Sequence, residues 1–388
     1  MIETDEQKDE FRREVTDFLA EFWAGGRGQA DLSAFHKEAV ERGYIFRVVP
    51  KEYGGSGQEP DAVKAHIISE EFDRAGAPLR MTGALRQFLP TLLAHGTDEQ
   101  KRRFIPPTLS GEIIWCQGYS EPGAGSDLAS QSTKAVLEGD EWVINGQKIW
   151  TSNAHKSTHM YLLVRSEPDK PKYENLSYLI MPMKQPGVTV RPLKQITGES
   201  TFNEVFFDNA RTPKDWIVGE RGKGWIVSRT TLDHERAVVG STDATSNLFG
   251  KLMRLARTTD LGGRPAIEDP FIRDELIRIH SLIEAQKAEF VEETERALAG
   301  RTRSAASGAF AKLYGSKISE RIALLAQRIM GGVAIGYPAG GGRGAARWTD
   351  QFMNSIAAQI GGGSSNMQRN VIAEKHLGAP RDIRGPGQ

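Results

Sequence analysis

Three short segments of the chain gather side chains of the kinds that bind ligands or move protons. The first runs from Cys116 to Asp127 and ends in a loop of proline and glycine that carries two serines and two carboxylates. Glycine-rich loops let backbone N–H groups approach an anionic or carbonyl-bearing ligand closely. An ordinary β-turn has the same composition, so this loop indicates a binding site only in combination with other features.

The second segment places Trp150 between Lys148 and Ser152. An indole ring beside small hydroxyl side chains can cover a flat aromatic ligand while the hydroxyls hydrogen-bond its edge. A tryptophan packed into the core at the end of a β-barrel gives the same pattern. The segment therefore fits both a cofactor site and a structural role.

The third segment, Leu232 to Arg236, contains two acids, a histidine and an arginine. Neighbouring residues on a helix lie ~100° apart, so Asp233 points about 200° away from Glu235 and only one of the two acids can face a ligand. Asp233 and His234 do not make a metal site, because no second pair of ligands follows at helix spacing. A solvated helix surface would also have this composition.

The elements around these segments are predicted to be helical, then β, then helical again. From Phe11 to Phe22 apolar side chains recur at helix spacing between charges, as in an amphipathic helix. Thr97 and Gln100 fit a capping box that begins another helix, and the pair Pro106-Pro107 is expected to end it. Two more helices are predicted by their periodicity, Leu32 to Arg42 and Asp61 to Ala75.

Between about Gly111 and Gly224 the pattern changes to short strands. Residues 141–144 and 147–150 flank Asn145-Gly146, a pair that strongly favours a β-hairpin turn. Several short strands within about a hundred residues indicate a barrel or a sandwich. Further strands are predicted at 160–164, 177–181, 188–191 and 205–207.

From Trp225 the helical pattern returns, with long amphipathic stretches from Ile272 to Leu298 and from Ala309 to Met330. Glycine clusters follow at 339–344 and 361–363. The predicted fold class is α+β. Its three parts are an N-terminal helical domain (1–112), a central β-barrel domain (113–224) and a C-terminal helical bundle (225–388).

Composition and charge narrow the class of protein. Lys and Arg number 50 and so do Asp and Glu, so we expect no general affinity for nucleic acid or an anionic membrane. The one cysteine, Cys116, excludes an internal disulfide and fits a reducing compartment. We expect it to be a small buried residue. No apolar run reaches the ~18 residues that span a bilayer, and the charged N-terminus does not resemble a signal peptide. The protein is therefore expected to be cytoplasmic.

Several common enzyme classes lack their signature motifs in this chain. It has no G-x-x-x-x-G-K-[ST], H-E-x-x-H or G-x-S-x-G sequence. No signature motif therefore supports a P-loop, zinc-protease or serine-hydrolase function.

Taken together, the three segments resemble the acyl-CoA dehydrogenase family, and the resemblance covers nearly the whole chain. It rests on SEPGAGSD at 120–127, NGQKIW at 145–150 and GSSNMQR at 363–369, in this order. It also covers the succession of helices, β domain and helices. The family implies that the chain holds FAD and desaturates an acyl-CoA substrate, with no metal.

The resemblance implies roles for individual residues. Ser120 would hydrogen-bond the flavin ring, Trp150 would flank it, and Ser152 would lie near its N5 edge. Ser364 and Asn366 match cofactor-contacting residues of the last loop, where Thr and Gln are more usual, and both keep hydrogen-bonding groups. The substrate-contacting residues that the resemblance implies are Ser126, Arg236 and Gly362.

The resemblance also selects a base. Most family members carry a catalytic Glu on the last loop, and the matching position here is Gly362. A minority carries it on the helix after the β domain, where Glu235 stands. Glu235 would therefore remove the α-proton, while a ribityl hydroxyl of FAD and the backbone N–H of Gly362 hold the thioester oxygen. The β-hydrogen would leave as hydride to flavin N5, and the electrons would pass to an electron-transfer flavoprotein.

Two motifs of the family are altered in this chain. No Arg-x-x-Phe-Gly sequence occurs near Arg257, and residues 328–334 read RIMGGVA where the family has Gln-x-x-Gly-Gly-x-Gly. In the family these residues contact FAD across a subunit interface. Their loss indicates an unusual FAD site or a partner subunit that supplies them, in a homo- or hetero-oligomer built as a dimer of dimers.

Other functions on the same fold stay open. A flavin monooxygenase or nitroso-forming relative would consume oxygen and would not need Glu235. A non-catalytic chain would be a partner subunit of a mixed oligomer or a nucleic-acid-associated relative, and the zero net charge disfavours the latter. For the dehydrogenase, Gly361 and Gly362 remove side chains from a loop that borders the acyl pocket. That favours a branched or ring-bearing acyl group, as in steroid side-chain degradation.

Overall fold

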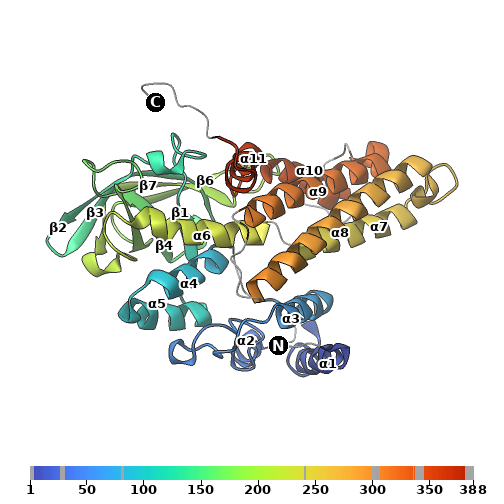
Figure 1. Cartoon of the computed structure of the whole chain (residues 1–388), viewed down its shortest axis with the longest axis horizontal. Helices are drawn as coiled ribbons and strands as arrows, with labels where there is room; N and C mark the ends of the chain where they lie inside the picture. Colours follow the sequence, from blue (N-terminus) through green and yellow to red (C-terminus); the bar gives the residue numbers. More distant parts are fainter. Residues whose placement is uncertain are drawn as a thin grey trace. The chain divides into compact units, whose positions relative to one another are not determined.

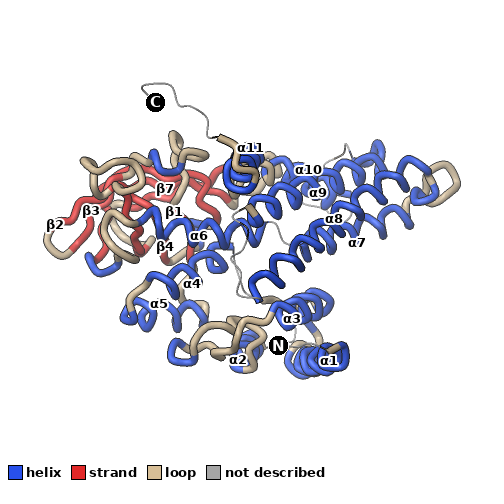
Figure 2. Tube along the Cα trace, in the orientation of Figure 1, coloured by secondary structure: helices blue, strands red, loops and turns tan. Residues whose placement is uncertain are grey.

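The computed structural model describes residues 4–26, 31–79, 83–239, 242–298, 304, 306–334, 336 and 345–380. Along the chain, helices are followed by strands and then by helices again, as Figure 2 shows by colour. The predicted α+β fold class is confirmed. The chain divides into two compact units, Met1–Pro192 with Phe202–Thr230 and Leu193–Thr201 with Thr231–Gln388. The domain boundaries at 112 and 224 stay a prediction.

The N-terminal helices pack around aromatic side chains. Phe18 of the first helix stacks on Phe35 and Phe72, with ring centroids 5.5 and 6.2 Å apart, and all three are buried. These contacts join helices that are distant in sequence, which explains the apolar spacing from Phe11 to Phe22. The helices are α1 (Asp5–Phe22), α2 (Leu32–Glu41), α3 (Ala62–Ala75), α4 (Gly83–His95) and α5 (Asp98–Ser110).

Helix α5 begins as predicted and ends later than predicted. The capping box is confirmed, since Thr97 accepts from the Gln100 backbone N–H and the Gln100 side chain accepts from Thr97 N–H. The helix then continues through Pro106-Pro107 and stops at Gly111, whose φ is 85°. Each proline removes a backbone donor, but the buried Ile105 and Thr108 on either side keep this turn packed.

Within the described residues the strands form one seven-stranded curled sheet in the order β1-β4-β2-β3-β7-β6, and β5 lies outside this order and pairs with β4 (Figure 1). The predicted strands at 160–164, 177–181, 188–191 and 205–207 are confirmed within it. The strands are β1 (Trp115–Gly118), β2 (Lys134–Glu138), β3 (Glu141–Ser152), β4 (His159–Arg165), β5 (Leu176–Pro182), β6 (Val188–Leu193) and β7 (Phe202–Pro213). A core of buried apolar side chains, including Trp142, Met160 and Leu162, holds the sheet together.

The hairpin predicted at Asn145-Gly146 is wrong. β3 runs unbroken through both residues, and the turn of the hairpin lies earlier, between β2 and β3, where Glu138 pairs with Glu141 and Gly139 has a φ of 61°. Asn145 uses its side chain to accept from the backbone N–H of Asn209, 2.9 Å away on β7. The Asn-Gly pair therefore marks an irregularity in the β3–β7 ladder, where the register shifts after Ile144.

The C-terminal helices surround a second apolar core. Helices α7, α8 and α9 lie side by side (Figure 1) and bury Leu252, Ile279 and Ile322 among other side chains. The long helices predicted at 272–298 and 309–330 are confirmed as α8 and α9. The elements are α6 (Gly224–Val239), α7 (Thr242–Thr258), α8 (Pro270–Leu298), α9 (Ser307–Met330), α10 (Ala345–Ala357), α11 (Ser365–Val371) and a π-helical turn (Ile372–His376). The glycine cluster at 339–344 lies outside the described residues.

Among the described residues, no helix combines the length and the apolar character that crossing a bilayer requires.

Candidate functional site

The loop that follows β1 is fastened to β3 by a buried ion pair. Lys148 Nζ donates to Glu121 Oε1 over 2.8 Å, and both side chains are almost fully buried. The other Glu121 oxygen accepts from the backbone N–H and hydroxyl of Ser132 at 2.6 and 2.7 Å. Lys148 also donates to the Gln131 side chain and to the Tyr119 carbonyl, at 2.7 and 3.1 Å. Because every charge is met by several partners, this pair fixes the loop without an exposed contact.

Both members of the pair are charged at neutral pH. Burial raises the pKa of Glu121, but the Lys148 charge and hydrogen bonds from Lys148, Thr133 and Ser132 outweigh it and lower the pKa to about 2. Burial lowers the pKa of Lys148 to about 8, although the Glu121 carboxylate acts in the opposite direction. At pH 7 the charged pair therefore holds the loop and the strand together.

Ser120 and Ser126 lie at the two ends of this fastened loop. The Ser120 carbonyl accepts from Ile149 N–H at 2.9 Å, which ties the residue directly to β3. Glu121 and Ala124 close a tight turn through two backbone hydrogen bonds of 3.0 Å. Ser126 is exposed. The loop thus presents one half-buried serine beside β3 and one serine on the surface.

Trp150 is pushed out of the sheet by a β-bulge. The β3–β7 register shifts between Lys148 and Thr151, and Trp150 has a φ of 61°, which is uncommon for a bulky residue. Its side chain is 59% exposed and meets Phe202 edge-on, with ring centroids 6.1 Å apart. A tryptophan packed into the core is therefore excluded. Such backbone outliers cluster at ligand sites, because the strain serves to aim a side chain.

Ser152 ends β3 just beyond the bulge. It pairs with Phe202 of β7 and is exposed, while the Thr151 side chain before it is buried. Ser120, Trp150 and Ser152 are thus carried by one loop and one strand end of the same unit. A flat ligand could meet an indole face and hydroxyl groups there.

The acids of the third segment differ in exposure along α6. Asp233 is exposed and Glu235 is half-buried, and both belong to the second compact unit. The side chain of Arg236 lies outside the described residues. Glu235 acts on the buried Lys312 of α9: burial lowers the pKa of Lys312, and the Glu235 charge raises it. Glu235, the half-buried acid, therefore lies near the buried Lys312 cation.

The glycine loop Gly361–Gly363 joins α10 to α11 in the same unit. Gly362 and Gly363 have φ values of 67° and 86°, which side-chain-bearing residues adopt only with strain. The buried Gln368 donates to the carbonyls of both, at 3.3 and 3.1 Å. The loop therefore has a defined shape that is stabilised by a side chain of the following helix.

Ser364 and Asn366 take part in local hydrogen bonds. The Ser364 hydroxyl caps α11 by accepting from Met367 N–H at 3.4 Å, and Asn366 Oδ1 accepts from Arg369 at 2.9 Å. Ser364 is half-buried and Asn366 is exposed. Their assignment as cofactor contacts stays a prediction, as do those of the other predicted site residues.

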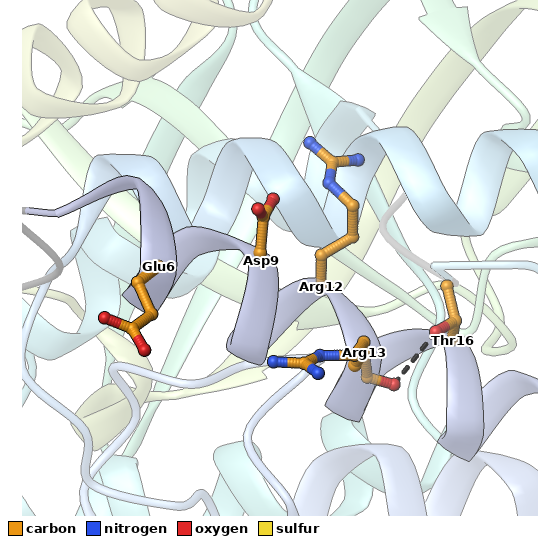
Figure 3. Close-up of a pocket in the computed structure, with 5 residues that line it drawn as sticks. All are labelled: Glu6, Asp9, Arg12, Arg13 and Thr16. Carbon is orange, nitrogen blue, oxygen red and sulfur yellow. Dashed lines mark hydrogen bonds between the residues drawn. The ribbon is translucent and has the colours of Figure 1, made fainter.

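A surface hollow on α1 offers no comparable chemistry. Figure 3 shows its lining residues spread along a single helix, with Arg13 turned away from Arg12. The Arg12 side chain already forms ion pairs with Glu70 and Glu71. A ligand would meet few side chains that converge on one point there.

Glu121, Lys148 and Lys312 were not predicted to have a role in the site. The first two lie inside the segments that the sequence singled out, but a single sequence does not reveal that two charges 27 positions apart form a buried pair. Lys312 has a weaker signal, since it is flanked by Ala311 and Leu313 on the apolar side of a helix. A lysine in such a position is a candidate for a buried cation.

Comparisons with known proteins identify the family of the chain. The acyl-CoA dehydrogenase N-terminal, middle and C-terminal domain models match residues 4–112, 116–210 and 222–377. The chain is 38% identical to acyl-CoA dehydrogenase IpdE1 of Mycobacterium tuberculosis, over 97% of this chain and 99% of the relative. It is 35% identical to IpdE1 of Mycolicibacterium smegmatis, over 99% and 100%.

Two solved structures are similar over nearly the whole chain. The ChsE4-ChsE5 complex from Mycobacterium tuberculosis contains a chain that is 30% identical, with a TM-score of 0.80 and coverage of 99% and 100%. The Tcur3481-Tcur3483 steroid ACAD contains one that is 29% identical, with a TM-score of 0.79 and coverage of 97% for both. With three domain models matched from residue 4 to 377 and relatives above 30% identity along its length, this chain belongs to the acyl-CoA dehydrogenase family.

Proposed function

We propose that the chain binds FAD and desaturates an acyl-CoA thioester, with Glu235 as the base that removes the α-proton. The observation that carries the proposal is Trp150: an indole that is 59% exposed, at a φ of 61°, beside a loop fastened by the Glu121–Lys148 pair. Its recorded ring contact is the edge-on one with Phe202, so most of the indole stays open to a ligand. Family membership supplies the matching ligand, a flavin ring.

The residues present fit FAD on the ring side. The half-buried Ser120 is fixed through its carbonyl to Ile149 and offers a hydroxyl for a ring heteroatom. Trp150 offers an aromatic face, and Ser152 offers a second hydroxyl on the same strand. FAD, when bound, would accept the β-hydrogen and two electrons from the substrate.

The chain itself would supply the proton chemistry. The α-C–H of a thioester is a weak acid, so its removal needs a positioned base and a donor for the carbonyl oxygen. Glu235 is the half-buried acid of α6 and would take the proton at its carboxylate. The backbone N–H of Gly362 would donate to the thioester oxygen from the shaped glycine loop. Asp233, exposed on the same helix, is not proposed as a base.

The proposed substrate class is a bulky, ring-bearing acyl group. Gly361 and Gly362 leave the last loop without side chains, and a methyl group built at Gly361 would only touch the Ala357 carbonyl at 3.6 Å. A similar solved structure, Tcur3481-Tcur3483, is described as a steroid ACAD. Comparison of kcat/KM for a steroid-derived acyl-CoA and a straight medium-chain acyl-CoA tests this. A clear preference for the straight chain would refute it.

A partner is also proposed. The similar ChsE4-ChsE5 structure is a complex of two different chains, and this chain lacks Arg-x-x-Phe-Gly near Arg257. We infer a dimer of dimers in which a second chain completes the FAD site. Electrons are proposed to leave through an electron-transfer flavoprotein.

Anaerobic titration of the purified protein with an acyl-CoA is the decisive experiment. The proposal expects a yellow protein that releases FAD on denaturation and bleaches on addition of substrate. Trp150→Ala should weaken FAD binding with little loss of stability. Oxygen consumption with a second substrate and no anaerobic bleaching would indicate a monooxygenase-type relative. A colourless protein that takes up no FAD, alone or with a partner chain, would indicate a non-catalytic subunit.

A further inference from the structure

Lys312 is a buried lysine in the middle of α9. Its side chain is 0% exposed, and a lysine is almost never fully buried unless its charge is met by other groups. Burial lowers the pKa of Lys312, as expected for a cation taken out of water. Burying the ammonium group carries a desolvation penalty that a hydrophobic side chain would not have. The lysine at this position is therefore expected to have a role other than packing.

The groups around Lys312 lead to the glycine loop. Lys312 Nζ donates to the backbone carbonyl of Gln359 at 3.4 Å. Ser316 and Glu320 follow Lys312 at helix spacing, and the Gln359 side chain donates to the Ser316 carbonyl and to Glu320, at 3.3 Å each. One face of α9 therefore holds Gln359 from three successive turns.

Gln359 in turn fixes the far end of the loop. Its backbone carbonyl accepts from Ser365 N–H at 2.9 Å, and its side-chain oxygen accepts from the Ser365 hydroxyl at 2.7 Å. Gly361–Gly363 is the short bridge between these two residues. The shape of the loop thus depends on Gln359, and Gln359 depends on α9.

The second group near Lys312 is Glu235. The Glu235 carboxylate acts electrostatically on the Lys312 ammonium group, and Glu235 lies on α6 of the same compact unit. The charged groups recorded here are therefore the Lys312 cation and Glu235 on α6, while Glu320, two turns further along α9, contacts the Gln359 side chain. Lys312 thus contacts the start of the loop through Gln359 and lies within electrostatic range of the α6 acid.

We propose that Lys312 is a positioning residue that holds the Glu235 carboxylate and the Gln359 end of the glycine loop around one buried positive charge. This inference rests on the proposed function, in which Glu235 takes the α-proton and Gly362 N–H binds the thioester oxygen. Both groups must keep a fixed separation to act on one substrate. A buried cation also favours the ionised form of a nearby carboxylate, the form that can accept a proton.

The first test removes the charge and keeps the length of the side chain. Lys312→Met should retain FAD and slow anaerobic bleaching at neutral pH by about 10-fold, less than the loss of the base itself. Its bleaching rate should rise at higher pH than in the wild type, because a carboxylate without a nearby cation keeps its proton longer. Lys317→Met, an exposed lysine of the same helix, is the matched control and should leave the rate and its pH profile unchanged.

The conservative variant separates charge from packing. Lys312→Arg should keep the wild-type pH profile, because the positive charge remains. Wild-type rate and pH profile in Lys312→Met would overturn the proposal. Equal loss in Lys312→Met and Lys312→Arg, with unchanged pH profiles, would also overturn it, because that outcome describes a packing defect.

A double-mutant cycle that measures Tm tests the interaction even if Lys312→Met is destabilised or the proposed chemistry is wrong. If the two charges interact, Lys312→Met should lower the Tm of the wild type by about 2–4 °C more than it lowers the Tm of the Glu235→Gln variant. Additive changes in Tm would refute the interaction. Failure of Glu235→Gln to slow bleaching would refute the proposed base without affecting this cycle, so the two failures are distinguishable.

Discussion

Glu235 and Asp233 stand two positions apart on α6, and only Glu235 is half-buried. Glu235→Gln keeps the size of the side chain and removes its basicity. Anaerobic flavin bleaching should slow by about 10²–10⁴-fold, the usual contribution of a positioned general base, while FAD content and acyl-CoA affinity persist. Asp233→Asn is the matched control and should change the rate little.

A carboxylate introduced on the last loop offers a complementary test of the base. Gly362→Glu in the Glu235→Gln background should restore part of the bleaching rate, because the family uses both positions to reach the same carbon. A wild-type bleaching rate in Glu235→Gln alone would show that this carboxylate is not the base.

The Glu121–Lys148 pair predicts how stability depends on pH. The pKa of Glu121 is lowered from 4.5 to about 2 in the folded protein, so its contribution is complete above pH 4.5 and is lost as the pH falls towards 2. The loss amounts to about 3 kcal/mol. Urea unfolding between pH 7 and 3 should show this decline. Glu121→Gln should flatten that part of the curve and, at pH 7, destabilise by about 3–5 kcal/mol because Lys148 stays buried without its partner.

The matched control for this prediction is Asp127. Its carboxylate pairs with Lys172 at 2.7 Å but is 58% exposed, so Asp127→Asn should change stability by at most about 1 kcal/mol. If the free energy of unfolding of Glu121→Gln falls as steeply at acid pH as that of the wild type, other carboxylates cause the decline.

At the scale of elements, the irregular strand β3 decides where the site residues point. Gly146 has a φ of 145°, and a methyl group built there would meet the Thr133 Cα at 2.7 Å. Gly146→Ala should therefore destabilise the protein by about 1–3 kcal/mol, measured by urea unfolding. It should also weaken FAD binding, since Thr133 N–H donates to Glu121 at 3.0 Å.

Gly139 in the β2–β3 turn serves as the control. It also has a positive φ, 61°, but nothing lies within 4 Å of a methyl group built there, and Asn tolerates this conformation. Gly139→Asn should change stability by less than about 0.5 kcal/mol. If both glycine variants are equally destabilised, backbone conformation and not the Thr133 contact explains the need for glycine at 146.

The helices and most strands could be predicted because their signals are local. Apolar periodicity located α1, α3, α8 and α9, and the Thr97–Gln100 pair located the start of α5. The course of β3 could not be predicted, since Asn145 and Gly146 owe their conformations to Asn209 and Thr133, which lie elsewhere in the sequence. The prediction that Pro106-Pro107 ends α5 failed for the same reason, because buried neighbours and not the local backbone determine where the helix ends.

At the scale of the whole molecule, cofactor occupancy tests the need for a partner. The chain purified alone should hold less than one FAD per chain, because the family's interface motif near Arg257 is missing. Co-expression with a second acyl-CoA dehydrogenase chain that carries the motif should raise FAD content and yield a mixed oligomer. Absorbance spectra and light scattering measure both. Full FAD content in an oligomer of this chain alone would contradict the prediction.

Family and fold class could be predicted from the sequence because short motifs in a fixed order carry them, and FAD binding stays a prediction. The predicted site residues fall into two groups by unit: Ser120, Trp150 and Ser152 in one, Glu235 and Gly362 in the other. What the sequence could not reveal are the charges that position them. Lys148 and Lys312 act through partners that only folding brings near, such as Glu121 and Gln359.

The single thiol of the chain makes it a convenient subject for labelling chemistry. Cys116 is fully buried in β1, and burial raises its pKa to about 12, so the folded protein should resist maleimides and iodoacetamide at neutral pH. Its slow modification would report opening of the sheet and would time unfolding without an added probe. A cysteine introduced at an exposed position, such as Ser126→Cys, would carry a dye at one site while the native thiol stays silent.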